Sequence, residues 1–287
     1  MSHKKLIIIG AGRSGTNMLR DVLTMAPGIG TWPCDEINYI WRHGNRGWNT
    51  DELDVSHARP AVRSFIQDAF TRVARCGNLA WIVEKTCANS VRVPFVHQVV
   101  PDARFVMIVR DGRDVVSSAM KRWRAPLDLR YILAKARFVP PSDVPYYAIR
   151  YLANRMSSLT NEDRRLASWG PRCDGLHDVL RADGLVAACA HQWARCVSLA
   201  STALDALPKD RVVRIRYEDF VRQPTDGLER IGALLDQPLP RQAMDAAARF
   251  VSPASVGKWR TDLAAEALAS AMPHLQPTLV AHGYDAD

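Results

Sequence analysis

Residues 6–23, LIIIGAGRSGTNMLRDVL, constrain the fold of this chain more than any other stretch. The apolar run LIII is typical of a buried β-strand, and it leads into a loop that contains Gly10, Gly12 and Gly15. Apolar residues then recur at helical spacing in TNMLRDVL. A strand, a glycine loop and a helix start together present backbone N–H groups and the helix dipole to a phosphate.

The glycine loop differs from the P-loop of ATP-binding proteins. Gly10 and Gly15 have the spacing of the motif G-x-x-x-x-G-K-[ST], but Thr16 and Asn17 stand where that motif has Lys and then Ser or Thr. The lysine that bridges the terminal phosphates of ATP is therefore missing, and Arg13 lies inside the loop instead. The sequence predicts a site for a phosphorylated ligand other than ATP with magnesium.

Apolar segments alternate with helical patterns along the chain. We predict strands at 5–9, 79–84, 104–109 and 211–216, with a weaker one at 29–33, and helices at 16–25, 60–75, 89–100, 114–123, 186–206 and 226–236. This alternation predicts an α/β fold with a P-loop-like nucleotide-binding core. We expect a doubly wound parallel sheet of about five strands with helices on both faces and ligands at the carboxyl ends of the strands.

The length of 287 residues suits one α/β domain, so we predict a single domain over residues 1–287. Residues 124–185 interrupt the alternation and are rich in Pro, Gly, Arg and Tyr. We predict that they form an insertion or lid on the substrate side, because long irregular segments in compact domains are often functional. A surface excursion without a role is the alternative.

Composition narrows the classes of partner. The net charge of +8 fits an anionic ligand, and the scatter of Arg along the chain argues against a nucleic-acid partner. The apolar runs are too short to span a bilayer, and MSHKK followed by LIIIG is no signal peptide. Six cysteines without C-x-x-C pairing indicate neither a metal site nor a disulfide framework, so we expect a cytoplasmic protein of unknown oligomeric state.

A second informative stretch, RFVMIVRDGRDVVSSAMKRW, runs from Arg104 to Trp123. Its strand ends at Arg110, and Asp111 with Asp114 forms an imperfect capping box at the start of a helix. Ser118 and Arg122 are four residues apart and so share one face of that helix. Arg110, Ser118 and Arg122 can converge on one phosphate, for which Arg provides bidentate, charge-assisted hydrogen bonds.

The two stretches together resemble sulfotransferases that use 3′-phosphoadenosine 5′-phosphosulfate (PAPS). G-x-x-R-S-G-T-N-x-L resembles the 5′-phosphosulfate loop of that family, and residues 104–123 resemble its 3′-phosphate site. The similarity covers residues 5–124, with weaker matches at 211–224 and 255–260, and is closest to the branch with tyrosylprotein and related bacterial enzymes. It implies a sulfotransferase domain that needs no metal and transfers a sulfuryl group to a hydroxyl-bearing acceptor: peptide tyrosine, a carbohydrate or a small molecule.

The resemblance also implies roles for individual residues. Ser14, Gly15, Thr16 and Asn17 would hold the 5′-phosphosulfate, and Arg13 would stabilise charge on the transferring group. Arg110, Ser118 and Arg122 would hold the 3′-phosphate. In the weaker matches Tyr217 would lie near the adenine, or else in the core; Lys258 would reach a phosphate and Trp259 would cover the base.

Transfer to a hydroxyl needs a base, and Glu36 in TWPCDEINYIW stands where the glutamate-based branch keeps its catalytic carboxylate. Asp35 is the rival, both residues could merely cap the next helix, and His43, His57 and His97 are further candidates, of which His97 fits a packed position better. Lys85, at the end of a predicted strand, would stabilise the leaving group, or else pair with Glu84.

Two other functions remain open from the sequence alone. A P-loop kinase or NTPase needs the missing lysine and a strand that ends in a magnesium-binding Asp, whereas here Thr16 and Arg110 stand at those positions. A non-catalytic nucleotide-binding module predicts no base near the transferable group, so Glu36 and Lys85 weigh against it.

Overall fold

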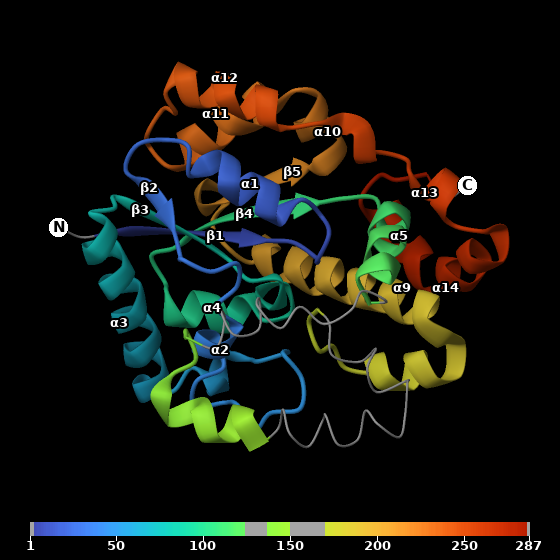
Figure 1. The fold of residues 1–287 in the computed structure, drawn as a ribbon, viewed down its shortest axis with the longest axis horizontal. Helices are drawn as coiled ribbons and strands as arrows, with labels where there is room; N and C mark the ends of the chain where they lie inside the picture. The colour runs from blue at the N-terminus through green and yellow to red at the C-terminus, as the bar shows by residue number, and fades with distance from the viewer. Residues whose placement is uncertain (1–2, 124–136, 150–169, 286–287) are drawn as a thin grey trace.

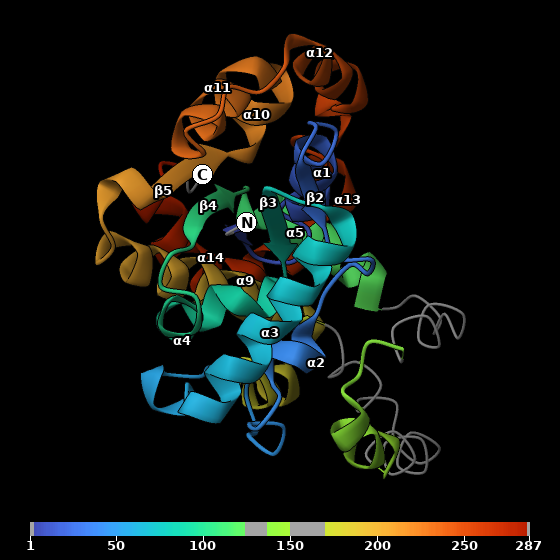
Figure 2. The ribbon, with the colours of Figure 1, turned by 90° about the vertical axis from the view of Figure 1, so that its left-hand side faces the viewer.

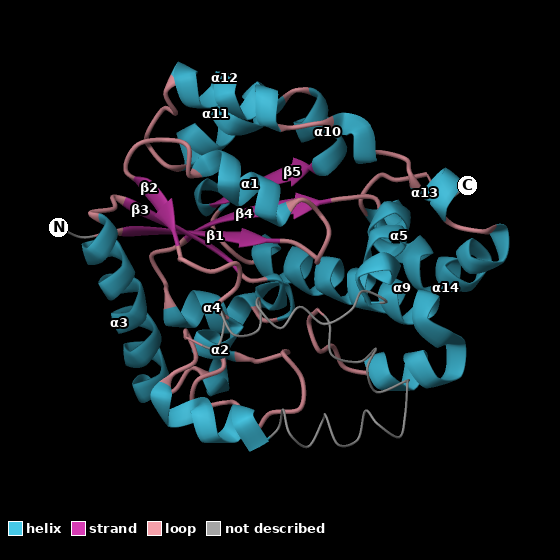
Figure 3. Cartoon of the chain, viewed as in Figure 1, coloured by secondary structure: helices cyan, strands magenta, loops and turns pink. Residues whose placement is uncertain are grey.

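A computed structural model describes residues 3–123, 137–149 and 170–285 of the chain (Figure 1). Its centre is a five-stranded sheet, magenta in Figure 3, with the order β2-β3-β1-β4-β5. The strands are β1 Lys4–Ile9, β2 Ile29–Thr31, β3 Trp81–Lys85, β4 Arg104–Val109 and β5 Val212–Arg216. All neighbouring strands pair in parallel. The predicted α/β fold, with its parallel sheet of five strands, is confirmed.

Strand β1 is central, and its register decides what meets at the carboxyl edge of the sheet. Ile8 pairs with Lys85 of β3, and Ile9 pairs with Met107 of β4. The glycine loop after β1, Lys85 and Arg110 therefore lie at one edge. These residues come together because the strands are parallel, so their carboxyl ends lie at the same edge of the sheet.

The helices form two layers, one on each face of the sheet (Figures 1 and 2). Ile7 and Ile9 of β1 belong to one core, which includes buried residues of α3, α4, α9 and α14. Leu6 and Ile8 belong to the other core, with residues of α1, α10, α11 and α12. This alternation places apolar side chains on both faces, as expected for a strand buried on both sides.

The bounds of the helices are α1 Thr16–Leu23, α2 Asn38–Trp41, α3 Pro60–Gly77, α4 Val93–Val99, α5 Gly112–Trp123, α9 Leu176–Asp205, α10 Tyr217–Arg222, α11 Pro224–Leu234, α12 Arg241–Phe250, α13 Trp259–Asp262 and α14 Ala265–Ala281. The predicted helix at 89–100 is divided, because a 3₁₀ turn at Cys87–Val91 precedes α4. The helix predicted at 186–206 corresponds to the part of α9 that follows Gly184, whose φ of 83° and ψ of -175° interrupt the helix; the part before this kink begins at Leu176.

The last residues of the predicted insertion over 124–185 belong to α9, which begins at Leu176 and packs in the main core. The described residues 137–149 of this segment contact residues that follow α2. The fully buried Asp143 carboxylate accepts from His43 Nδ1 at 2.9 Å and also pairs with Arg46. Residues 124–136 and 150–169 lie outside the described residues, so the lid stays a prediction.

Candidate functional site

The glycine loop has a backbone that restricts which residues can occupy it. Gly15 adopts φ 87°, and a Cβ there would lie 2.6 Å from the Tyr217 ring. A Cβ on Gly10 would lie 2.8 Å from the Ile108 carbonyl oxygen. Arg13 itself has φ 72°, a left-handed conformation that is uncommon for a residue with a side chain. Such backbone conformations concentrate at ligand-binding loops.

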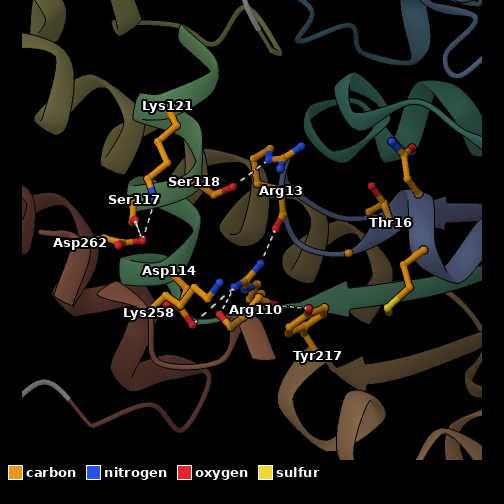
Figure 4. Close-up of a pocket in the computed structure, with 14 residues that line it drawn as sticks. Arg13, Thr16, Arg110, Asp114, Ser117, Ser118, Lys121, Tyr217, Lys258 and Asp262 are labelled. Carbon is orange, nitrogen blue, oxygen red and sulfur yellow. Dashed lines mark hydrogen bonds and ion pairs between the residues drawn. The ribbon is translucent and has the colours of Figure 1, made fainter. Parts of the chain in front are cut away.

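A pocket of about 410 Å³ opens beside this loop (Figure 4). Its lining comes from the glycine loop, the start of α1, Arg110 with one face of α5, Tyr217, and the segment from Ser255 to Asp262. The predicted cofactor residues that line it are Arg13, Gly15, Thr16, Asn17, Arg110, Ser118, Tyr217 and Lys258. Residues more than 200 positions apart in the sequence therefore share one cavity.

Cations crowd one wall of the pocket. Arg13 Nε donates to Ser118 Oγ at 2.9 Å, and Arg110 Nη1 donates to the Arg13 carbonyl oxygen at 3.2 Å (Figure 4). Burial, together with the nearby charges of Arg122 and Arg110, lowers the pKa of Arg13. A positive group that is penalised by burial and by like charges is stabilised when an anion binds beside it.

Arg110 is positioned by contacts on several sides. Its guanidinium lies 4.5 Å from the Tyr217 ring centroid, and the Tyr217 hydroxyl is 2.6 Å from Ser255 Oγ. Arg110 Nη2 also donates to the Ser255 carbonyl oxygen. Within the described part of the chain, the buried Nε of Arg110 has no hydrogen-bond partner. A buried donor without an acceptor costs free energy, so this N–H is suited to donate a hydrogen bond to an oxygen of a ligand.

The capping prediction for α5 is half right. Asp111 Oδ1 accepts from the Arg113 N–H at 2.9 Å, as an N-cap does. Asp114 does not complete the capping box. Its carboxylate instead accepts from the backbone N–H groups of Gly257 and Trp259, at 2.8 and 2.9 Å. The signal for this contact is tertiary, because the partners are more than 140 residues away.

Three predicted cofactor residues do not line the pocket. Trp259 is 8% exposed, and the guanidinium groups of Arg113 and Arg260 lie over its ring, at 4.3 and 4.6 Å from the centroid. Arg122 is exposed at the end of α5 but acts on Arg13 through its charge. Ser14 is fully buried, and its hydroxyl has no partner among the described residues.

Glu36 and Lys85 form an ion pair, and neither is among the residues that line the pocket. Lys85 Nζ lies 2.9 Å from Glu36 Oε1, and the Cys87 N–H donates to the same oxygen at 3.3 Å. Burial lowers the pKa of Lys85, but the charge of Glu36 and its hydrogen bond to Lys85 raise it, and the net shift is upward. Cys87 Sγ is 3.8 Å from Thr16 Oγ1, so the pair connects to the start of α1.

The alternative pairing of Lys85 with Glu84 is wrong. Glu84 points to the opposite side, where its carboxylate accepts from Thr86 Oγ1 at 2.5 Å and from Asn89 Nδ2 at 2.8 Å. The two side chains separate because successive residues of a strand face opposite sides of the sheet.

The other candidate bases contact partners that do not line the pocket. Asp35 lies 3.6 Å from Arg20 Nη1, and His43 pairs with Asp143. His57 bonds Asp54 in a capping box at a 3₁₀ turn, and His97 lies on α4 with its ring against Phe105. None of the three histidines lines the pocket.

Several residues that line the pocket were not predicted from the sequence. Ser117 and Lys121 line the cavity, and both bond Asp262 Oδ2, at 3.1 and 2.8 Å (Figure 4). Their spacing of four residues on α5 was a usable signal, as for Ser118 and Arg122. Ser255 opens the weaker family match at 255–260, whereas nothing local marks Asp262 as a pocket residue.

The described residues contain no helix long and apolar enough to cross a bilayer. Within the same residues, no group of three or more His, Cys, Asp or Glu side chains is arranged to hold a metal ion.

The chain belongs to the sulfotransferase family. The family model matches residues 5–137 and 148–241, which is more than half of the chain. A candidate protein-tyrosine sulfotransferase of Caenorhabditis briggsae is 26% identical over 125 residues, covering 42% of this chain and 45% of that protein. The match therefore spans less than half the length of that relative.

Solved structures share the fold. The sulfotransferase domain of the olefin synthase from Synechococcus PCC 7002 has a TM-score of 0.55 at 15% identity, covering 99% of this chain and 95% of that one. The mouse sulfotransferase SULT7A1 complexed with PAP has a TM-score of 0.50 at 14% identity, covering 99% and 90%.

Proposed function

We propose that this protein is an enzyme that transfers a sulfuryl group from PAPS to a hydroxyl-bearing acceptor. The observation that carries the proposal is the cationic pocket beside the glycine loop, where the buried Arg110 Nε has no partner within the described residues. Family membership supports the class of reaction. The structure of the mouse neighbour is a complex with PAP, which supports the choice of nucleotide.

The residues of the pocket fit this nucleotide. The N–H groups at the start of α1, with Thr16 and Asn17, would hold the 5′-phosphosulfate, because a helix N-terminus attracts anions. Arg110, Ser118 and Arg122 would hold the 3′-phosphate, while Arg13, which donates to Ser118 and lies close to Arg122, would stabilise charge on the transferring group. Lys258 also lines the pocket and would reach a phosphate. Tyr217 lies under Arg110 and would support that end of the pocket.

Glu36 is proposed as the base. Bound PAPS supplies a sulfuryl group on a phosphate leaving group, and the acceptor hydroxyl must lose a proton during transfer. The Glu36 carboxylate would take that proton, while the Lys85 ammonium, 2.9 Å away, holds the carboxylate in place and stabilises negative charge. Burial, with the Glu36 charge adding to it, raises the pKa of the Cys87 thiol to about 12, so this neighbour stays protonated.

The structure gives no support to a kinase. Thr16 occupies the place of the P-loop lysine, and β4 leads into Arg110 rather than a metal-binding carboxylate. The acceptor is proposed only as a hydroxyl compound. Tyrosine-containing peptides are the first class to test, because the relative from Caenorhabditis briggsae is named as a protein-tyrosine sulfotransferase.

The proposal predicts selective binding of 3′,5′-bisphosphorylated adenosine (PAP). PAP should bind at least 10-fold more tightly than AMP, because one charge-assisted contact to the 3′-phosphate is worth about 1.5–3 kcal/mol. Calorimetric titration with both nucleotides measures this ratio. Equal affinities would refute the 3′-phosphate assignment. A transfer assay with sulfur-labelled PAPS against pools of peptides, glycans and phenols would then identify the acceptor.

A further inference from the structure

The backbone on both sides of Arg110 is held by residues outside the two motifs. The Arg110 carbonyl oxygen accepts from Trp193 Nε1 of α9 at 3.2 Å. On the other side of Arg110, the Asp111 N–H donates to Glu218 Oε1 at 3.0 Å. The second oxygen of that carboxylate accepts from the Tyr284 hydroxyl at 2.8 Å. A chain of hydrogen bonds thus connects the C-terminal region to the start of α5.

This chain of bonds is buried. Glu218 and Tyr284 are 6% and 5% exposed. The Arg216 guanidinium covers the Tyr284 ring at 4.0 Å, and its Nε lies 3.7 Å from the Glu218 carboxylate. Burial, reinforced by Glu218, raises the pKa of Tyr284, so its hydroxyl keeps its proton and donates it. A buried carboxylate with these donors has one preferred orientation.

The position of Glu218 in the chain makes the contact relevant to the pocket. It follows Tyr217, whose ring lies 4.5 Å from the Arg110 guanidinium. One residue therefore supports the Arg110 side chain, while the next fixes the peptide that follows Arg110. If Glu218 lost its orientation, the Asp111 N–H would lose its acceptor and Arg110 would lose a restraint on its backbone.

We propose that Glu218 and Tyr284 are positioning residues that hold Arg110 in place for the 3′-phosphate of the nucleotide. The inference rests on the proposed function, which assigns Arg110 to that phosphate. A simple packing role for Tyr284 would affect stability but would leave the choice between nucleotides unchanged. The positioning role affects the contact that distinguishes PAP from AMP.

The test is Tyr284→Phe, which removes only the hydroxyl, with titration of both PAP and AMP well below the thermal midpoint. We expect the PAP affinity to fall about 5- to 10-fold, the effect of one weakened hydrogen bond, with the AMP affinity unchanged. Tyr146→Phe is the matched control. Its hydroxyl donates to the Arg46 carbonyl oxygen at 2.9 Å, away from Arg110, and its loss should leave the ratio as in the wild type.

Glu218→Leu gives an independent check, because a leucine side chain can accept neither from the Tyr284 hydroxyl nor from the Asp111 N–H. This variant should lower the PAP-to-AMP ratio, and adding Tyr284→Phe to it should lower the ratio little further, since the bond between the two residues is already broken. A wild type that prefers PAP, with the ratio retained in both variants, overturns the inference and leaves the proposed function intact. A wild type without any preference for PAP overturns both.

Discussion

At Glu36, one carboxylate oxygen accepts from both the Lys85 ammonium and the Cys87 N–H. Glu36→Gln keeps the shape of the side chain but removes its ability to take a proton. Turnover should therefore fall by roughly 10²- to 10⁴-fold, the usual contribution of a general base, with little change in nucleotide affinity. The measurement is the transfer rate on an acceptor found by screening, with PAP titration of the same variant.

Asp35→Asn is the control for Glu36→Gln, because Asp35 faces Arg20 and its loss should be milder. Near-normal turnover of Glu36→Gln together with an inactive His43→Ala variant would transfer the role of the base to the histidine.

Gly15 is a residue whose replacement should affect both stability and binding. At φ 87° any side chain is strained, and a Cβ would also approach the Tyr217 ring to 2.6 Å. Gly15→Ala should destabilise the fold by more than the roughly 1–2 kcal/mol of the backbone strain alone, and should weaken PAP binding. Denaturant unfolding and titration measure the two effects.

Gly283→Ala is the matched control, because Gly283 has φ 69° but no heavy atom within 4 Å of its would-be Cβ. If both variants lost the same stability, the close approach to Tyr217 would have no energetic consequence.

At the scale of elements, α5 is bonded to the C-terminal segment that closes one side of the pocket. Asp114 accepts from two backbone N–H groups of residues 257–259 and lies 3.6 Å from Arg110 Nη2. Asp114→Asn replaces one acceptor oxygen with a donor, so one of these N–H groups loses its partner. We expect PAP affinity to fall about 10-fold and proteolytic cleavage near residue 257 to accelerate.

The same substitution at Asp226, an exposed residue in the first turn of α11, should change neither property. An Asp114→Asn variant with normal protection of the segment would show that other contacts hold it.

At the scale of the whole molecule, Glu84 should give the stability a pH dependence. It is 1% exposed, and burial raises its pKa from 4.5 to about 7. Between these two values the unfolded chain releases the proton that the folded protein retains. The free energy of unfolding should therefore fall as the pH rises through this window, by on the order of 3 kcal/mol.

Glu84→Gln removes the titration. Its stability relative to the wild type should improve steadily between about pH 4.5 and pH 7, which denaturant unfolding at several pH values would detect. Glu229→Gln, at an exposed position, is the control for replacing a carboxyl group with an amide. A stability difference that is constant with pH would show that Glu84 is not the group responsible.

The sequence by itself determined the sheet, the glycine loop and the candidate residues that follow β1 and β4 or lie on α5. Each of these depends on local periodicity, so LIIIG and RFVMIVR identified their strands, and Arg110 could be placed at a strand end. Helix bounds were less accurate at residues 89–100, where a 3₁₀ turn at Cys87–Val91 precedes α4.

Only the tertiary structure decided which distant groups meet. It joined Lys85 to Glu36 rather than Glu84, brought Asp114 to residues 257–259, and connected Tyr284 through Glu218 to the peptide after Arg110. Contacts of this kind leave no periodic signal, because they depend on strand order and register, which bring residues far apart in sequence to one edge of the sheet.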